Sequence, residues 1–293
     1  MNITASVNGQ VGPDTPKPVQ RDWSALRPVS LDTLSQETVV FSPGKEFLIS
    51  PGIMRRDPSD VIRHGDHYYV WYTKVLKGKA GYPGGWCGTV WYATSPDGEN
   101  WTERGQAVDK GAEGAWDSAG TYTPNILPYE GKFYLAYTAM RAPFIKKTSR
   151  ASIGLTVADS PDGPWRKLDA GPAITPGESL DSPDGFLCDD TVFVLRDDRI
   201  WLYYKGYPAR LEGGRRVRAG GNTFLLAATA TNPEGPYTKV PQILHRGHEA
   251  MVWKDKDAVG SMGLAFGPKC YFTSRNGIDF SAVHKLKPLK AAG

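Results

Sequence analysis

One unit recurs along the chain at a nearly constant interval, and each copy begins with a short polar turn followed by an aromatic strand. The first three copies close on Tyr72, Tyr137 and Tyr204, which are almost evenly spaced. A regular internal period is typical of architectures in which each repeat is one supersecondary unit. The repeat therefore constrains the fold more than any other feature of the sequence.

The second half of each unit carries a turn of one kind, in which a proline, an acidic residue and a glycine precede an aromatic residue. Proline presets φ in such a turn, and glycine adopts the positive φ that the turn requires. Copies lie at residues 95–101, 160–165 and 232–237, with a degenerate copy at 274–280. We expect each turn to join two strands, with the aromatic residue packed back on the hairpin.

Each unit also opens with an apolar or β-branched strand, so that every copy contains segments for four strands. This pattern is typical of a β-propeller blade, whose first strand lines a central channel. Four blades account for residues 56–286, and the apolar segment 39–52 supplies strands for a fifth. The sequence thus predicts an all-β protein: an N-terminal arm over 1–38 and a five-bladed β-propeller over 39–293. A β-sandwich is the alternative, but such a period is unusual for sandwiches.

Composition narrows the classes of partner. The chain has 35 Lys and Arg against 31 Asp and Glu and no long basic run, so we expect no nucleic-acid partner. No apolar run approaches the ~20 residues of a membrane helix, so we expect no membrane partner. Three widely spaced cysteines indicate no disulfide framework and favour a reducing compartment. No signal peptide is visible, so we expect a cytoplasmic protein, or a periplasmic one if a signal was removed.

Acidic residues recur where the inner strands begin. Asp57 opens the first unit, Asp189 and Asp190 open the third, and the pair His248 and Glu249 opens the fourth. Asp57 and Asp189 precede the repeat tyrosines of their units by the same number of positions, which predicts one shared structural register. Carboxylates that converge on a channel shift each other's pKa, which separates a base from an acid. The alternative is that these residues only cap turns.

Two motifs resemble those of known enzymes. Asp57-Pro58-Ser59, preceded by Arg55-Arg56 and followed by a Tyr-Tyr-Val-Trp-Tyr strand, and Gly247-His248-Glu249-Ala250 look like motifs of the five-bladed glycoside hydrolases of families 43 and 117. The His-Glu pair resembles family 117 most, the 3,6-anhydro-L-galactosidases that act on neoagaro-oligosaccharides. The resemblance implies an inverting, exo-acting hydrolase that releases a terminal sugar, 3,6-anhydro-L-galactose or a related residue, from oligosaccharides. Neoagarobiose, a fragment of agarose, is the expected substrate.

The resemblance also implies roles for individual residues. Asp57 would be the general base that activates water, and Asp189 or Asp190 would orient the sugar or tune a pKa. His248 or Glu249 would supply the acid, because a histidine can donate a proton near neutral pH. No cofactor is required, but family 117 is associated with a divalent cation, for which His245, His248 and Glu249 are candidate ligands.

The N-terminal arm bears on the oligomeric state. Family 117 members commonly carry an arm that swaps between subunits and contains a Ser-Ala-Arg pattern. Residues 23–27 are a contracted form of this pattern, and the chain is short for the family. The resemblance therefore implies a homodimer formed through the arm.

Sugar binding needs flat apolar faces for the C–H side of the ring and strong donors for the hydroxyls. Trp86 and Trp116 lie in Gly-rich loops and are the best candidates for stacking on a sugar. Arg55, Arg56 and Lys205 flank the predicted channel and are candidates for binding hydroxyls or acidic substituents. They could equally neutralise the carboxylate cluster.

Three other functions fit the same pattern. A furanosidase of the family 43 type, an arabinofuranosidase or xylosidase, would use the same carboxylates. A glycoside phosphorylase would need a basic cluster, for which Lys146, Lys147 and Arg150 are the compact group. A non-catalytic carbohydrate-binding propeller would be favoured if Asp57 and Glu249 were turn caps that point away from the axis.

Overall fold

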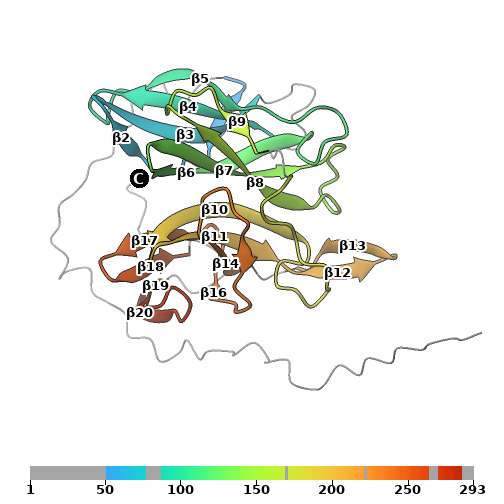
Figure 1. Ribbon diagram of the computed structural model, residues 1–293. Helices are drawn as coiled ribbons and strands as arrows, with labels where there is room; N and C mark the ends of the chain where they lie inside the picture. The colour runs from blue at the N-terminus through green and yellow to red at the C-terminus, as the bar shows by residue number, and fades with distance from the viewer. Residues whose placement is uncertain (1–50, 77–86, 169–170, 221–222, 264–269, 286–293) are drawn as a thin grey trace, which may run out of the picture.

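The computed structural model describes residues 51–76, 87–168, 171–220, 223–263 and 270–285. These residues form strands and no helix, and each repeat folds into one antiparallel sheet (Figure 1). No helix in these ranges is long and apolar enough to cross a membrane. The predicted fifth blade and the N-terminal arm fall mainly on residues 1–50, outside the described part of the chain.

The strands follow one another from the inner to the outer edge of each sheet. Blade one contains β1 (Ile53–Arg56), β2 (Ile62–His64), β3 (His67–Leu76), β4 (Thr89–Ser95) and β5 (Thr102–Val108). Blade two contains β6 (Gly120–Tyr129), β7 (Lys132–Met140), β8 (Ala151–Ala158) and β9 (Arg166–Lys167). In blade one, β1 and β2 both pair with β3 and together form the inner strand.

Blades three and four repeat this order. Blade three contains β10 (Leu187–Arg196), β11 (Arg199–Tyr207), β14 (Phe224–Ala230), β15 (Thr238–Lys239) and β16 (His245–Arg246). Blade four contains β17 (Met251–Asp255), β18 (Ala258–Met262), β19 (Cys270–Ser274) and β20 (Ser281–Lys285). Blade three also carries an inserted hairpin, β12 (Ala209–Glu212) and β13 (Arg215–Arg218), between β11 and β14.

The predicted repeat positions are confirmed. Tyr72, Tyr137 and Tyr204 all lie on the second strand of their sheets, opposite the third strand. The glycine of each repeated turn has a positive φ, at Gly98, Gly163, Gly235 and Gly277. The repeats therefore fold as equivalent β-propeller blades.

Apolar residues fill the spaces between consecutive sheets. One cluster lies between blades two and three, with Ile153 and Leu202 fully buried. A second lies between blades three and four, around Phe272 and Phe280, and a third between blades one and two, around Trp71. Because this core lies between sheets, each blade is stabilised by its neighbours.

The repeat tyrosines also hold carboxylates, of which Asp117 and Asp184 are buried and Glu103 is partly buried. Tyr204 Oη donates to Asp184 over 3.0 Å, and Tyr72 Oη donates to Glu103 over 2.6 Å. A lysine ion-pairs with the acceptor in each case, and the same arrangement recurs in blade two. The three sets are Tyr72, Glu103 and Lys74; Tyr137, Asp117 and Lys167; and Tyr204, Asp184 and Lys239. This repeated cross-link was not predicted from the sequence.

Candidate active site

Each described blade has one residue in the left-handed backbone conformation near the start of its inner strand. The φ angle is 51° at Asp57, 46° at Thr123, 47° at Asp190 and 51° at Glu249. In every blade, the residue two positions after this left-handed residue is paired with the second strand. The four positions are therefore equivalent, and three of them carry carboxylates. Strained positions of this kind cluster at functional sites.

The register of blade three differs by one position from the prediction. Equal spacing from the repeat tyrosines aligned Asp57 with Asp189, whereas the backbone aligns Asp57 with Asp190. Between Ser59 and Ile62, the inner strand of blade one contains one residue more than the segment of the second strand that faces it. A β-bulge of this kind shifts every residue before it relative to the partner strand. The expected register was therefore wrong by one position.

Threonine hydroxyls connect the bulges of blades one to three. Thr73 Oγ1 donates to Asp57 Oδ2 over 3.3 Å and accepts the backbone N–H of Thr123 over 2.8 Å. Thr123 Oγ1 lies 2.6 Å from Thr138 Oγ1 and 3.3 Å from Asp189 Oδ1, to which it donates. Blade two, which lacks a carboxylate at its bulge, thus joins the carboxylates on either side of it.

Lys205 occupies the position in blade three that threonine holds in blades one and two. Its side chain is buried, with Nζ 3.3 Å from Asp189 Oδ2 and in contact with Asp190 Oδ2. Burial raises the pKa of Asp189, but Lys205 and the bond from Thr138 outweigh it and lower that pKa overall. Burial and the neighbouring Asp189 carboxylate raise the pKa of Asp190 to about 7. The adjacent aspartates thus have separated pKa values.

His248 lies beside this cluster and is held by a tyrosine. Tyr207 Oη pairs with His248 Nδ1 at 3.0 Å, and Nε2 lies 3.4 Å from Glu249 Oε1. Burial lowers the pKa of His248, and the charge of Lys205 lowers it further, against the opposing effect of Glu249. Arg218 packs on the face of the Tyr207 ring, with its guanidinium carbon 3.8 Å from the ring centroid.

The carboxylates of different blades act on one another electrostatically. Burial raises the pKa of Asp57, Arg56 opposes this, and both Asp189 and Glu249 raise it further. Asp57 in turn raises the pKa of Asp190. The structure therefore brings together the acidic residues that the sequence singled out, around the inner strands of three blades.

The candidate metal ligands do not form one set. His245 is buried, its ring stacks on Phe272 with centroids 4.2 Å apart, and its ring nitrogens contact Ser261 Oγ and the Arg246 carbonyl. Within the described residues, no three His, Cys, Asp or Glu side chains gather in a way that could hold a metal ion. His245 thus fits a core residue better than a ligand, and we assign no step to a metal.

The predicted sugar-binding residues have varied surroundings. Arg56 ion-pairs with Asp57, whereas Arg55 pairs with Glu103 at 3.0 Å in the tyrosine cross-link of blade one. Trp116 stacks on Tyr137 between blades one and two, with ring centroids 6.0 Å apart. Trp86 lies outside the described residues. Of these side chains, Arg56 and Lys205 contact the carboxylates, so both neutralise charge at the site.

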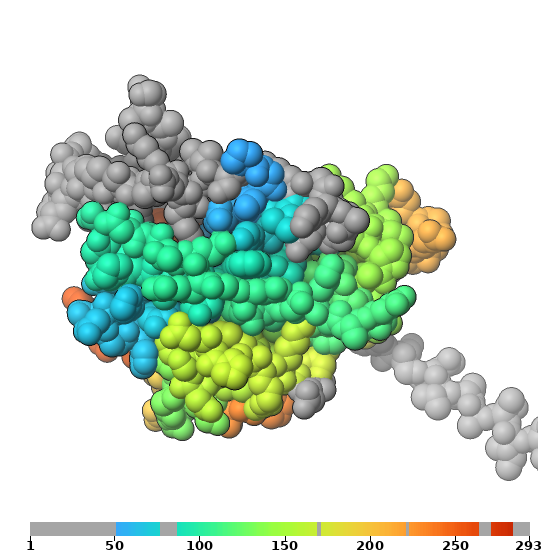
Figure 2. Space-filling model, turned by 90° about the horizontal axis from the view of Figure 1, so that it is seen from above, coloured from blue at the N-terminus to red at the C-terminus, as the bar shows by residue number. Residues whose placement is uncertain are grey.

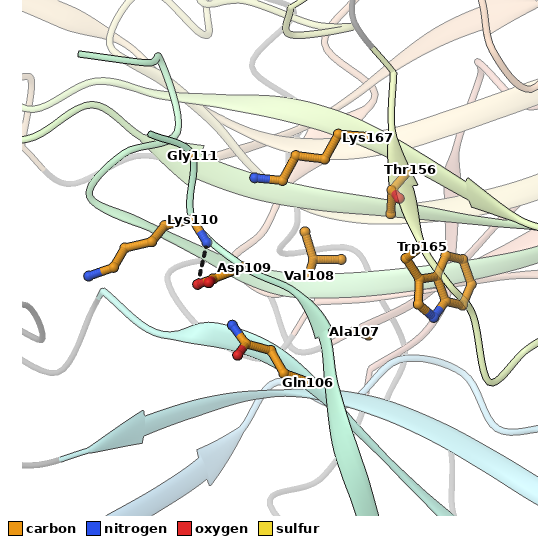
Figure 3. A pocket seen from close by; sticks show the side chains of 9 residues that line it. All are labelled: Gln106, Ala107, Val108, Asp109, Lys110, Gly111, Thr156, Trp165 and Lys167. Atoms are coloured by element: carbon orange, nitrogen blue, oxygen red, sulfur yellow. Dashed lines mark hydrogen bonds between the residues drawn. The ribbon is translucent and has the colours of Figure 1, made fainter. Parts of the chain in front are cut away.

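A separate hollow of about 500 Å³ lies between blades one and two. Gln106, Lys110, Trp165 and Lys167 are among its lining residues (Figure 3). Lys167 ion-pairs with the buried Asp117, and Trp165 packs edge-on against Trp71. The hollow contains none of the bulge carboxylates, so the candidate site is the carboxylate cluster.

Sequence reasoning missed the neutral members of this cluster. Thr73 and Thr138 directly follow the repeat tyrosines, as Lys205 does, so an alignment of the repeats would have found them. Thr123 stands at the bulge of blade two, the described bulge without a carboxylate, so a search for acidic residues passes over it. Tyr207 carries no signal in the repeat, because its role depends on the position of His248 in the next blade.

Comparisons with solved structures place this architecture among glycoside hydrolases. A family 117 glycoside hydrolase produced by the marine bacterium Zobellia galactanivorans is 28% identical, with a TM-score of 0.68 over 81% of this chain and 71% of that chain. A family 43 enzyme from Xanthomonas citri, solved with xylotriose, is 16% identical and shares the fold, with a TM-score of 0.55 over 80% of this chain and 75% of that one.

Sequence comparison gives the family. Arabinoxylan arabinofuranohydrolase of Bacillus subtilis is 27% identical over 54% of this chain, which matches only 33% of that longer protein. The model of the glycosyl hydrolases family 43 matches residues 51–220, more than half of the chain. The expected resemblance to families 43 and 117 is thus confirmed, and the chain belongs to glycosyl hydrolases family 43.

Proposed function

We propose that this chain is an inverting, exo-acting glycoside hydrolase that releases a terminal sugar from an oligosaccharide. The observation that carries the proposal is the equivalent placement of Asp57, Asp190 and Glu249 at the left-handed bulges of three blades. Hydrolysis of a glycosidic bond uses one carboxylate as base and a second group as acid. Equivalent bulges around one axis supply both from different sides of a bound sugar.

Asp57 is the proposed base. Thr73 donates to its Oδ2, which stabilises the ionised form, and Arg56 compensates its charge. Burial and neighbouring carboxylates hold its pKa above the ordinary value, which makes the ionised group a stronger base. Asp57 would take the proton from the attacking water.

The proposed acid is His248 or Glu249. The contact between Tyr207 and Nδ1 orients the imidazole, with Nε2 on the side of Glu249. Because the pKa of His248 is lowered, its imidazolium form is populated only below its usual range. If His248 is the acid, the rate should therefore fall as the pH rises, with a midpoint below ~6.5.

Asp189 and Asp190 are proposed to hold the sugar and to tune the pKa of the base, Asp57. Asp189 is the ionised member, because Lys205 and two hydrogen bonds favour its charged form. Its charge raises the pKa of Asp57. Asp190, with a pKa of about 7, is largely protonated below neutral pH and can donate a hydrogen bond to a sugar hydroxyl.

We propose 3,6-anhydro-L-galactose or a related residue as the released sugar, with neoagarobiose as the first substrate to test. The support is the 28% identity to a family 117 hydrolase together with the His248-Glu249 pair. The second candidate is an arabinofuranose released from arabino-oligosaccharides, which the likeness to an arabinoxylan arabinofuranohydrolase supports.

The test compares Asp57→Asn with Asp66→Asn on both substrates. Asn keeps the shape of Asp57 but cannot accept a proton, so kcat should fall by ~10² to 10⁴ while the melting temperature and substrate binding remain. Asp66 lies in an exposed turn at the other end of the same blade, so its variant should retain full turnover. Near wild-type turnover by folded Asp57→Asn contradicts the proposal, and binding without hydrolysis in the wild type indicates a carbohydrate-binding propeller.

A further inference from the structure

The inserted hairpin of blade three stands at the same end of the sheet as the bulge carboxylates. Leu187, at the start of the inner strand, pairs with Tyr207, the last residue of β11. The connection from β11 to β14 therefore begins beside the start of the inner strand, and β12 and β13 rise from it. Figures 1 and 2 show the hairpin projecting from one side of the molecule. It thus forms part of the rim of the candidate site.

The arginines of the hairpin have different surroundings. Arg216 donates to the carbonyls of Gly177 and Gly185, and Arg210 ion-pairs with Glu212 at 2.5 Å. Arg218 is exposed, and its guanidinium lies on the face of the Tyr207 ring. Within the described residues, no carboxylate lies at ion-pair distance from Arg218. Arg218 thus combines an exposed side chain with packing on an aromatic ring.

The position of Arg218 relates directly to the proposed acid. Tyr207 bonds to His248 Nδ1 at 3.0 Å, and the two ring centroids are 6.0 Å apart. A general acid lies beside the glycosidic oxygen and hence beside the first sugar of the leaving group. One aromatic ring thus separates His248, one of the two proposed acids, from the Arg218 guanidinium, which places Arg218 on the side of the leaving group.

The charge distribution divides the site into two regions. Asp57, Asp189 and Glu249 act on one another at the axis and are compensated in part by Arg56 and Lys205. The carboxylates outnumber these two cations, which disfavours a negative substituent on the terminal sugar. Arg218 favours such a substituent on the next sugar, because a guanidinium binds carboxylates and sulfates through paired, charge-assisted hydrogen bonds. Packing on an aromatic ring also holds the guanidinium in place before the ligand binds.

We propose that Arg218 binds an oxyanion, a carboxylate or a sulfate ester, on the leaving-group sugar, so that the substrate is an acidic oligosaccharide with an uncharged terminal residue. The orientation of the sugars rests on the proposed function. Binding of a charged monosaccharide by Arg218 does not depend on hydrolysis and can be measured separately.

The first experiment measures binding of galactose, galactose 6-sulfate and glucuronate by isothermal titration calorimetry. Wild type should bind at least one charged sugar about tenfold or more tightly than galactose. Arg218→Gln should abolish this preference, whereas Arg215→Gln, a change at an exposed arginine near the hairpin tip, should keep it. The two charged sugars distinguish a sulfate from a carboxylate. An equal preference in Arg218→Gln, no preference in wild type, or equally tight binding of inorganic sulfate overturns the proposal.

The second experiment measures kcat/KM on neoagarobiose and on the same disaccharide sulfated on its reducing-end sugar. Arg218→Gln should lower kcat/KM about tenfold more on the sulfated substrate than on the neutral one. A smaller loss on the neutral substrate is expected because Arg218 also packs on Tyr207, which holds His248. Equal losses on both substrates contradict a role in oxyanion binding. If wild type binds the charged sugars through Arg218 but hydrolyses neither disaccharide, the proposed substrate fails while the oxyanion site stands.

Discussion

Replacement of Lys205 by methionine tests how the aspartate pair is held. The Lys205 side chain is 6% exposed, and those of Asp189 and Asp190 are 13% and 16% exposed, so water screens their charges little. Methionine has a similar length and fits the same space but carries no charge. Lys205→Met would leave two adjacent, buried carboxylates without the cation that compensates them.

The size of the effect follows from this burial. Removing one partner of a buried ion pair costs about 3 to 5 kcal/mol. In the wild type, the lowered pKa of Asp189 contributes stability above its unfolded-state pKa, and this is lost as the pH falls through the folded value. In Lys205→Met we expect the pKa values of Asp189 and Asp190 both to lie above those of the unfolded chain. Folding then takes up protons, so the loss of stability is greatest above pH ~7 and shrinks as the pH falls.

Urea unfolding at pH 8 and pH 5 measures this directly. We expect Lys205→Met to lose about 3 to 5 kcal/mol at pH 8 and at least ~1 kcal/mol less at pH 5. Lys132→Met, at an exposed position in β7, should change stability by less than ~0.5 kcal/mol at either pH. Adding Asp190→Asn to Lys205→Met should recover stability at pH 8. A loss that is equal at both pH values, or below ~1 kcal/mol at pH 8, would refute this account of the cluster.

Two further substitutions test the network and the blade interface. Thr73→Val removes a donor to Asp57 and the acceptor of a buried N–H, so we expect the free energy of unfolding to fall by ~1 to 3 kcal/mol. The hydrogen bond from Thr73 lowers the pKa of Asp57, so its loss should shift the acidic limb of kcat/KM to higher pH. An unmoved limb in the pH profile would show that the contact does not act on the base. Gly154→Ala would place a Cβ 2.6 Å from Tyr137 Cζ and should cost ~1 to 3 kcal/mol in urea unfolding. Gly105→Ala, whose Cβ meets no atom closer than 3.9 Å, is the control, and equal losses in both variants would contradict the packing argument.

Local chemistry explains why the blade architecture could be predicted. The repeated Pro, acidic and Gly turns act over a few residues, and their glycines have the positive φ that such turns require. The alternation of the aromatic strands likewise depends on neighbours along the chain, which is why Tyr72, Tyr137 and Tyr204 were assigned to equivalent strands. The acidic residues at the inner strands could be selected for the same reason, as positions in a repeat.

The arrangement of the site depends on contacts between residues far apart in the sequence, and these only the tertiary structure decided. The extra residue near Ser59 changes the register, so that Asp190 rather than Asp189 matches Asp57. Spacing along the chain cannot reveal a bulge, because its effect appears only when the partner strand is in place. Likewise, burial and the contact of Lys205 with both aspartates separate the pKa values of Asp189 and Asp190, and His248 is held by Tyr207 of the preceding blade. These contacts exist only in the folded chain.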